Sequence, residues 1–135
     1  MPFDWQEYLA VARFLKGQGG AGFSEEAAIR TLISRAYYAA YGHALRFSRD
    51  YLGFVPGRLP EDRTQDHGRL RGHLRKRRRA FVASKLEQLR DWRNVSDYDD
   101  SPPTFDFQHR GAHALANAEY IIRALAPPGP ATAGS

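Results

Sequence analysis

The feature that most constrains the fold is a stretch from Glu25 to Asp50 that contains no proline and no cluster of helix-breaking residues. Ser24 precedes it as a good N-cap, and Glu25 and Glu26 suit the positive end of a helix dipole. Apolar side chains recur through it at helical spacing: Ile29, Leu32, Ile33, Ala36, Tyr37, Ala40, Ala44 and Phe47. The pattern predicts a single helix of about seven turns.

Apolar residues at the same spacing predict four further helices, and no segment has the pattern of a strand. The first helix follows Asp4 and Glu7, which have the spacing of a capping box, and ends at Lys16-Gly17. The third starts near His67, the fourth follows a break around residues 78–81, and the fifth opens at Thr104 or Asp106. We therefore predict an all-α, up-and-down bundle of about five helices over residues 1–126, followed by a disordered Pro/Gly/Ala tail over 127–135.

The composition excludes several classes of protein. There is no cysteine, so a disulfide scaffold, a thiolate metal site and a cysteine nucleophile are excluded. No apolar run is long enough to span a membrane, and the N-terminal residues lack the pattern of a signal peptide, which together predict a cytoplasmic protein. His109 and His113 lie four residues apart, but no third ligand accompanies them, so we expect no metal and no cofactor.

Positive charge is concentrated in one block, Arg58–Arg79, with nine basic and three acidic residues. The rest of the chain has 11 basic and 12 acidic residues, so the block holds all of the excess charge of +5. Its densest part is a predicted RNA- or phosphate-binding surface made of Arg69, Arg71, Arg75, Lys76, Arg77, Arg78 and Arg79. Polyanion binding needs only charge density, although the run also suits the negative end of a helix dipole.

The stretch from Leu89 to Asp99 is the most informative for function. Arg93 follows Leu89 and Trp92 closely enough to lie beside the packed face of the fourth helix. There it either pairs with Asp97 at i+4 or faces a protein-lined cleft. Asn94 is suited to bind a phosphate or ribose oxygen.

Two motifs resemble the HEPN superfamily, and in particular its small standalone bacterial and archaeal members. The first is Ser34-Arg35-Ala36-Tyr37-Tyr38-Ala39-Ala40-Tyr41-Gly42-His43-Ala44-Leu45. The second, about fifty residues later, is Leu89-x-x-x-Arg93-Asn94-x-x-Asp97-Tyr98-Asp99. The resemblance covers roughly residues 3–125, and the order and spacing of the two motifs carry it.

This resemblance implies an α-helical bundle that is usually a homodimer. In many HEPN proteins, an Arg-x(4–6)-His motif from each protomer meets across the interface and cleaves RNA without a metal. Histidine then transfers protons, arginine stabilises the phosphate charge and the ribose 2′-hydroxyl attacks. Arg93 and Asn94 match the start of that motif.

The histidine of the motif does not match. After four, five and six intervening residues the chain has Tyr98, Asp99 and Asp100. A phenol is a poor base and an ordinary carboxylate is a poor acid at pH 7, whereas imidazole can act as both acid and base. The predicted catalytic set is therefore Arg93, Asn94 and Tyr98, with His67 as the candidate histidine from another helix or from a partner chain.

Three functions follow as hypotheses. The first is an HEPN-like module that binds RNA or a nucleotide, or is a partner subunit in a toxin–antitoxin or phage-defence system, with weakened or absent catalysis. The second is a metal-independent endoribonuclease that uses Arg93 with a non-standard proton-transfer group. The third is a protein–protein dimerisation module. The expected partners are a second copy of the chain, RNA, and a protein encoded nearby such as a nucleotidyltransferase, with no membrane.

Overall fold

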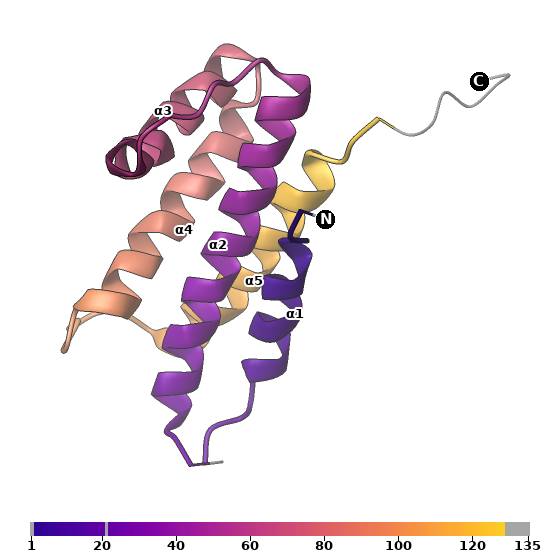
Figure 1. Cartoon of the computed structure of the whole chain (residues 1–135). Coiled ribbons are helices and arrows are strands. Elements are labelled where there is room, and N and C mark those ends of the chain that lie inside the picture. The colour runs from indigo at the N-terminus through magenta and orange to yellow at the C-terminus, as the bar shows by residue number, and fades with distance from the viewer. Residues whose placement is uncertain (1, 21, 129–135) are drawn as a thin grey trace, which may run out of the picture.

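The longest helix, α2 (Glu25–Tyr51), runs through the middle of the molecule and the other helices pack around it (Figure 1). In this computed structural model the described residues are 2–20 and 22–128, which contain five α-helices and no β-strand. The other elements are α1 (Gln6–Leu15), the 3₁₀ turn η1 (Pro60–Asp62), α3 (Arg63–Lys76), α4 (Ala80–Tyr98) and α5 (Phe107–Ala124). The predicted all-α bundle with a long second helix is confirmed.

The N-terminus of α2 forms as its sequence predicts. The hydroxyl of Ser24 accepts a hydrogen bond from the backbone N–H of Ala27 at 3.0 Å, and two glutamates occupy the first turn. The start of α5 is capped in the same way, because the carboxylate of Asp106 accepts from the backbone N–H of His109 at 3.1 Å. These caps satisfy backbone donors that have no partner inside the helix.

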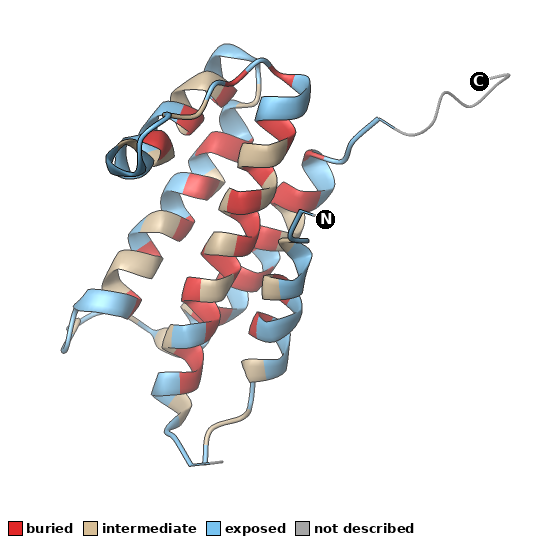
Figure 2. Ribbon diagram, viewed as in Figure 1, coloured by how far each residue is buried: buried red, intermediate tan, exposed pale blue. Residues whose placement is uncertain are grey.

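The small residues of α2 are used inside one chain. Ala36 and Ala40 are fully buried, and Figure 2 shows buried positions along most of the helix. A Cβ atom on Gly42 would lie only 2.0 Å from the ring of Trp5, so glycine is needed where the N-terminal segment crosses α2. The broad apolar stripe of α2 is therefore covered by α1, α4 and α5 of the same chain, and it does not by itself require a dimer.

The third helix begins at Arg63, four residues before the predicted start near His67. The prediction was wrong because the first turn has no apolar residue by which to detect it. η1 leads directly into α3, and the carboxylate of Asp62 accepts from the backbone N–H of Leu59 at 3.1 Å. The preceding turn η1, rather than apolar spacing, therefore marks this boundary.

The arginine run ends α3 and forms the turn to α4 instead of continuing as a helix. Arg78 has a positive φ of 63°, in the left-handed region. The N–H of Arg79 donates to the carbonyl of Leu74 at 2.8 Å, and the N–H of Arg78 donates to that of Arg75 at 3.2 Å. This is a Schellman C-cap, with arginine at the position where glycine is most favourable.

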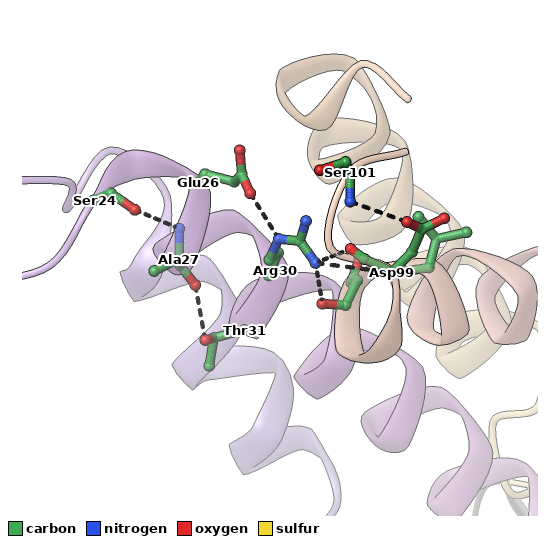
Figure 3. Close-up of polar contacts among 9 residues, drawn as sticks. Ser24, Glu26, Ala27, Arg30, Thr31, Asp99 and Ser101 are labelled. Atoms are coloured by element: carbon green, nitrogen blue, oxygen red, sulfur yellow. Dashed lines mark hydrogen bonds and ion pairs between the residues drawn. The ribbon is translucent and has the colours of Figure 1, made fainter. Parts of the chain in front are cut away.

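The C-terminal end of α4 is held against α2 by Arg30 (Figure 3). Its Nη1 donates to the carbonyls of Ser96 at 2.9 Å and Asp99 at 2.8 Å, and its Nε donates to Glu26 at 2.9 Å. These carbonyls lack partners within the helix, so one guanidinium satisfies several of them. The contact fixes the turn of α4 that carries Arg93 and Tyr98.

No helix within residues 2–20 and 22–128 is long and apolar enough to cross a membrane. Of the predicted disordered tail, residues 129–135 lie outside the described part of the chain.

Candidate functional site

Three tyrosines of α2 meet a histidine of α3. The ring of His67 stacks on the ring of Tyr41, with centroids 4.0 Å apart and planes 3° from parallel. Its Nδ1 is hydrogen-bonded to the hydroxyl of Tyr37, which lies one helical turn before Tyr41. Tyr38 contacts the same imidazole edge to face, at 6.5 Å between centroids. His67 is thereby fixed in position and held away from bulk water on one side.

Arg93 reaches the same cluster from α4. Its guanidinium carbon lies 5.4 Å from the ring centroids of both Tyr37 and Tyr38, and 5.9 Å from that of Tyr98. Tyr37 therefore contacts both Arg93 and His67, which belong to different helices. We call the cluster of Tyr37, Tyr38, His67, Arg93 and Tyr98 the arginine cleft; the name denotes these contacting side chains, of which Tyr98 also lines a shallow pocket at the end of α4.

The predicted ion pair of Arg93 is present, and its guanidinium is also packed against tyrosine rings. Its Nη1 lies 3.7 Å from the Oδ2 of Asp97, which is an ion pair but too long for a good hydrogen bond. The side chain is only 12% exposed, and its buried Nε has no hydrogen-bond partner among the described residues. The guanidinium thus retains donor capacity that its protein neighbours do not use.

Further guanidinium groups surround the cleft. Arg71 of α3 donates to the carbonyl of His67 at 3.2 Å, and its Nε lies 3.7 Å from the Oε1 of Glu87. Arg35 of α2 packs on the other side of Tyr38, with its guanidinium carbon 5.3 Å from the ring centroid. The cleft is therefore positively charged as well as aromatic.

This environment lowers the pKa of His67 to about 4. Burial is the largest cause, and the positive charges of Arg93, Arg90 and Arg71 add to it, in that order. The carboxylate of Asp66 acts in the opposite direction but is outweighed. At pH 7 about one His67 side chain in a thousand is protonated, so the imidazole is neutral.

The tyrosines of the cluster are held neutral by the same burial. Burial raises the pKa of Tyr41 to about 12, with a further contribution from the carboxylate of Asp66. The pKa of Tyr37 is raised well above its usual range by burial and by its neighbour Tyr41. Tyr37 therefore hydrogen-bonds His67 as a phenol and does not act as a base near neutral pH.

The predicted catalytic residues are divided between two places. Arg93, His67 and Tyr98 belong to the arginine cleft, and the ring of Tyr98 is 75% exposed at its edge. Asn94 lines a shallow pocket at the end of α4 together with Tyr98 and Asp99, so this pocket adjoins the cleft through Tyr98. Asp99 and Asp100 give this pocket negative charge, which opposes phosphate binding beside Asn94.

The predicted phosphate-binding residues are also divided. Arg69 pairs with the buried Asp66, and Arg71 and Arg75 both pair with Glu87. Arg79 packs on Phe47 at 5.6 Å, with its Nη1 donating to a backbone carbonyl. Lys76, Arg77 and Arg78 are exposed at the α3–α4 turn. We call these last three residues the basic turn.

Sequence reasoning missed the role of Tyr37, Tyr38 and Tyr41, of which it placed only Tyr37 on the apolar face of the helix. The i, i+4 spacing of Tyr37 and Tyr41 places them on one helical face, and this was the available signal. It also missed Arg35 and Arg90 as sources of charge at the cleft.

The five histidines form no metal site with other described residues, because no group of three or more potential ligands converges within residues 2–20 and 22–128. His109 and His113 contact each other on α5, with ring centroids 4.3 Å apart, and both are exposed. No protein-family model matches the chain, and no curated protein or solved structure matches it significantly. The interpretation of the cleft therefore depends on its geometry.

Proposed function

We propose that this chain is an HEPN-like helical module that binds RNA or a nucleotide in the arginine cleft, with weakened or absent catalysis. The observation that carries the proposal is the meeting of Arg93 and His67 on opposite helices around Tyr37. A guanidinium that rests on aromatic faces keeps its N–H groups directed outward at its edges, where a phosphate binds best. The exposed ring of Tyr98 offers a surface on which a base can stack.

The protonation state of His67 favours binding over cleavage. General acid catalysis needs a protonated imidazole, and a pKa of about 4 leaves very little of that form at pH 7. As a base, an imidazole with so low a pKa has a small driving force for accepting a proton. Proton transfer by His67 is therefore weak in the free protein.

The second candidate function is a metal-independent endoribonuclease that uses Arg93 and His67. The shared contact of the two residues with Tyr37 favours it, because it supplies a histidine that Arg93 lacks along its own helix. Cleavage by attack of the ribose 2′-hydroxyl would continue in EDTA and leave a 2′,3′-cyclic phosphate. Incubation of the purified protein with total RNA in EDTA tests this, and an absence of cleavage under all conditions excludes it.

A binding assay with variants of the cleft tests the main proposal. One charge-assisted hydrogen bond contributes about 1.5–3 kcal/mol, so we expect Arg93→Ala to weaken binding of a labelled RNA about 10- to 100-fold. Arg93→Lys retains the charge but not the planar fork and should be intermediate. Arg123→Ala removes one exposed arginine from α5 and is the matched control. Equal affinities for Arg93→Ala and Arg123→Ala would contradict the proposal.

The partners proposed with this function are a second copy of the chain and a protein encoded nearby, such as a nucleotidyltransferase. The apolar side chains of Val11 and Phe14 are 46% and 68% exposed on α1, which provides apolar surface outside the filled core. Light scattering at micromolar concentration tests the homodimer, and a monomer there would exclude it.

A further inference from the structure

Basic side chains line the packed seam between α3 and α4 from one end to the other. α3 lies against the half of α4 that follows the basic turn, as Figure 1 shows. The basic seam is the set Arg71 and Arg75 on α3, Arg90 and Arg93 on α4, and the basic turn Lys76, Arg77 and Arg78 that joins the two helices.

The rows on the two helices face each other. Arg71 and Arg75 are one turn apart on α3, and both reach the same carboxylate, that of Glu87 on α4, at 3.7 and 3.2 Å. Arg90 and Arg93 continue the row of Glu87 on α4 at spacings of three residues, which lie on one side of a helix. Arg90 also lies close enough to His67 of α3 to lower the pKa of that histidine.

The seam joins the basic block and the stretch around Arg93, the two regions that the sequence indicates as functional. Arg93 is thirteen residues beyond Ala80, where α4 begins, and a rise of 1.5 Å per residue places it about 20 Å from the basic turn. A stacked nucleic-acid strand advances about 3.4 Å per nucleotide, so this distance corresponds to about six nucleotides. One short strand can therefore reach both the basic turn and the arginine cleft.

The charges along the seam favour the phosphate backbone of such a strand. Glu87 is the carboxylate that separates the arginines in the middle of the seam, and two guanidinium groups already neutralise it. Nε of Arg71 and Nε of Arg93 are buried without a hydrogen-bond partner among the described residues. The exposed ring of Tyr98 at the far end suits an unstacked base, which a single strand offers and a duplex does not.

We propose that a single-stranded RNA segment of about six nucleotides lies along the basic seam, with its backbone on the arginines from the basic turn to Arg93. The proposal rests on the proposed function, because it extends the ligand of the arginine cleft along the basic seam. It makes a prediction that binding in the cleft alone does not make: affinity increases with strand length until the strand reaches the basic turn.

Fluorescence anisotropy with labelled oligouridylates of two to ten nucleotides measures this length dependence. We expect the hexamer to bind at least tenfold more tightly than the dinucleotide, with little gain beyond eight nucleotides. In the triple variant Lys76→Gln, Arg77→Gln, Arg78→Gln, the affinity for the hexamer should fall toward that for the dinucleotide. The salt slope for the hexamer should decrease by about two, because each phosphate contact contributes about 0.7 for single strands.

Matched variants separate a local contact from a general charge effect. Arg13→Gln, Lys16→Gln, Arg123→Gln removes three exposed charges from α1, its C-cap and α5, and should leave hexamer binding within about twofold. Arg78→Gly removes one charge from the basic turn at a position whose backbone favours glycine, so it keeps the fold and should still decrease the salt slope. Far-UV circular dichroism and melting curves verify that each variant is folded.

The outcomes distinguish this inference from the function on which it rests. If the wild-type protein binds the hexamer no more tightly than the dinucleotide, while Arg93→Ala weakens binding of both, the seam is overturned and the cleft remains. If a six-base-pair RNA duplex binds as tightly as the hexamer, the single-stranded ligand is wrong. If no oligonucleotide binds at millimolar concentration, the proposed function itself fails, and the seam with it.

Discussion

His67 should destabilise the protein at acidic pH, because its imidazole is held neutral in the folded state. Its pKa is lowered from the ordinary value of 6.5 to about 4, mainly by burial and then by three arginines. The unfolded chain therefore binds a proton between pH 6.5 and 4 that the folded chain does not bind. The free energy of unfolding therefore rises with pH between pH 4 and 6.5. Above pH 6.5 the imidazole is neutral in both states, and His67 no longer destabilises the fold.

The pKa shift of His67 sets an upper limit on the stability that the protein loses at acidic pH. At about 1.4 kcal/mol per unit, the shift corresponds to an upper limit of about 3 kcal/mol. Solvent reaches part of the ring, and screening reduces the electrostatic effect, so we expect a loss of about 1–2 kcal/mol by pH 4.5. The charged and titratable groups that face the ring are Tyr37, Tyr38 and Tyr41 on α2, Arg90 and Arg93 on α4, and Asp66 and Arg71 on α3 itself.

Urea unfolding of the wild type and of His67→Asn at pH 7.5 and 4.5 isolates this contribution. Asparagine retains a hydrogen-bonding group for Tyr37 but does not titrate, and the other acidic groups act equally in both proteins. We expect the wild type to lose about 1–2 kcal/mol more than His67→Asn on acidification. Equal losses, or an imidazole resonance of His67 that titrates near pH 6.5 by NMR, would refute the argument.

Three further substitutions test the packing that positions the site. Arg78→Gly should raise the free energy of unfolding in urea by about 0.5–1 kcal/mol, since it relieves a left-handed backbone, and an unchanged or lower value would contradict this. Gly42→Ala should lower it by about 1–3 kcal/mol because its Cβ meets Trp5, whereas Gly72→Ala, into open space, should not destabilise. Arg30→Met should lower the free energy of unfolding by about 1.5–3 kcal/mol, because it leaves the carbonyls at the end of α4 unpaired. An unchanged value would contradict this.

The parts of the fold that were predictable are those controlled by local sequence. Ser24 with two following glutamates fixes the start of α2, and the absence of proline fixes its length. The start of α3 was not predictable from apolar spacing, because residues Arg63 to Asp66 are all polar and the carboxylate that begins the segment belongs to Asp62. Periodicity detects the buried face of a helix, so it fails wherever a helical turn has no buried face.

The site was predictable only in part for a related reason. The position of Arg93 beside the packed face follows from its spacing to Leu89 and Trp92 along one helix. Its contact with the same ring as His67 joins residues 26 positions apart on two helices, and depends on how α3 packs across α4. Charge counts were informative in the same limited way, because they identified the basic block but not which arginines are already paired with Asp66 or Glu87.

The cleft combines two requirements that oppose each other in the free protein. The charges of Arg93, Arg90 and Arg71 attract a phosphate, and the same charges hold His67 in its neutral form. A bound phosphate brings negative charge to these arginines, which offsets their effect on the imidazole and raises its pKa toward the ordinary value. Under the proposed function, any capacity of His67 to transfer protons therefore depends on the charge of the ligand.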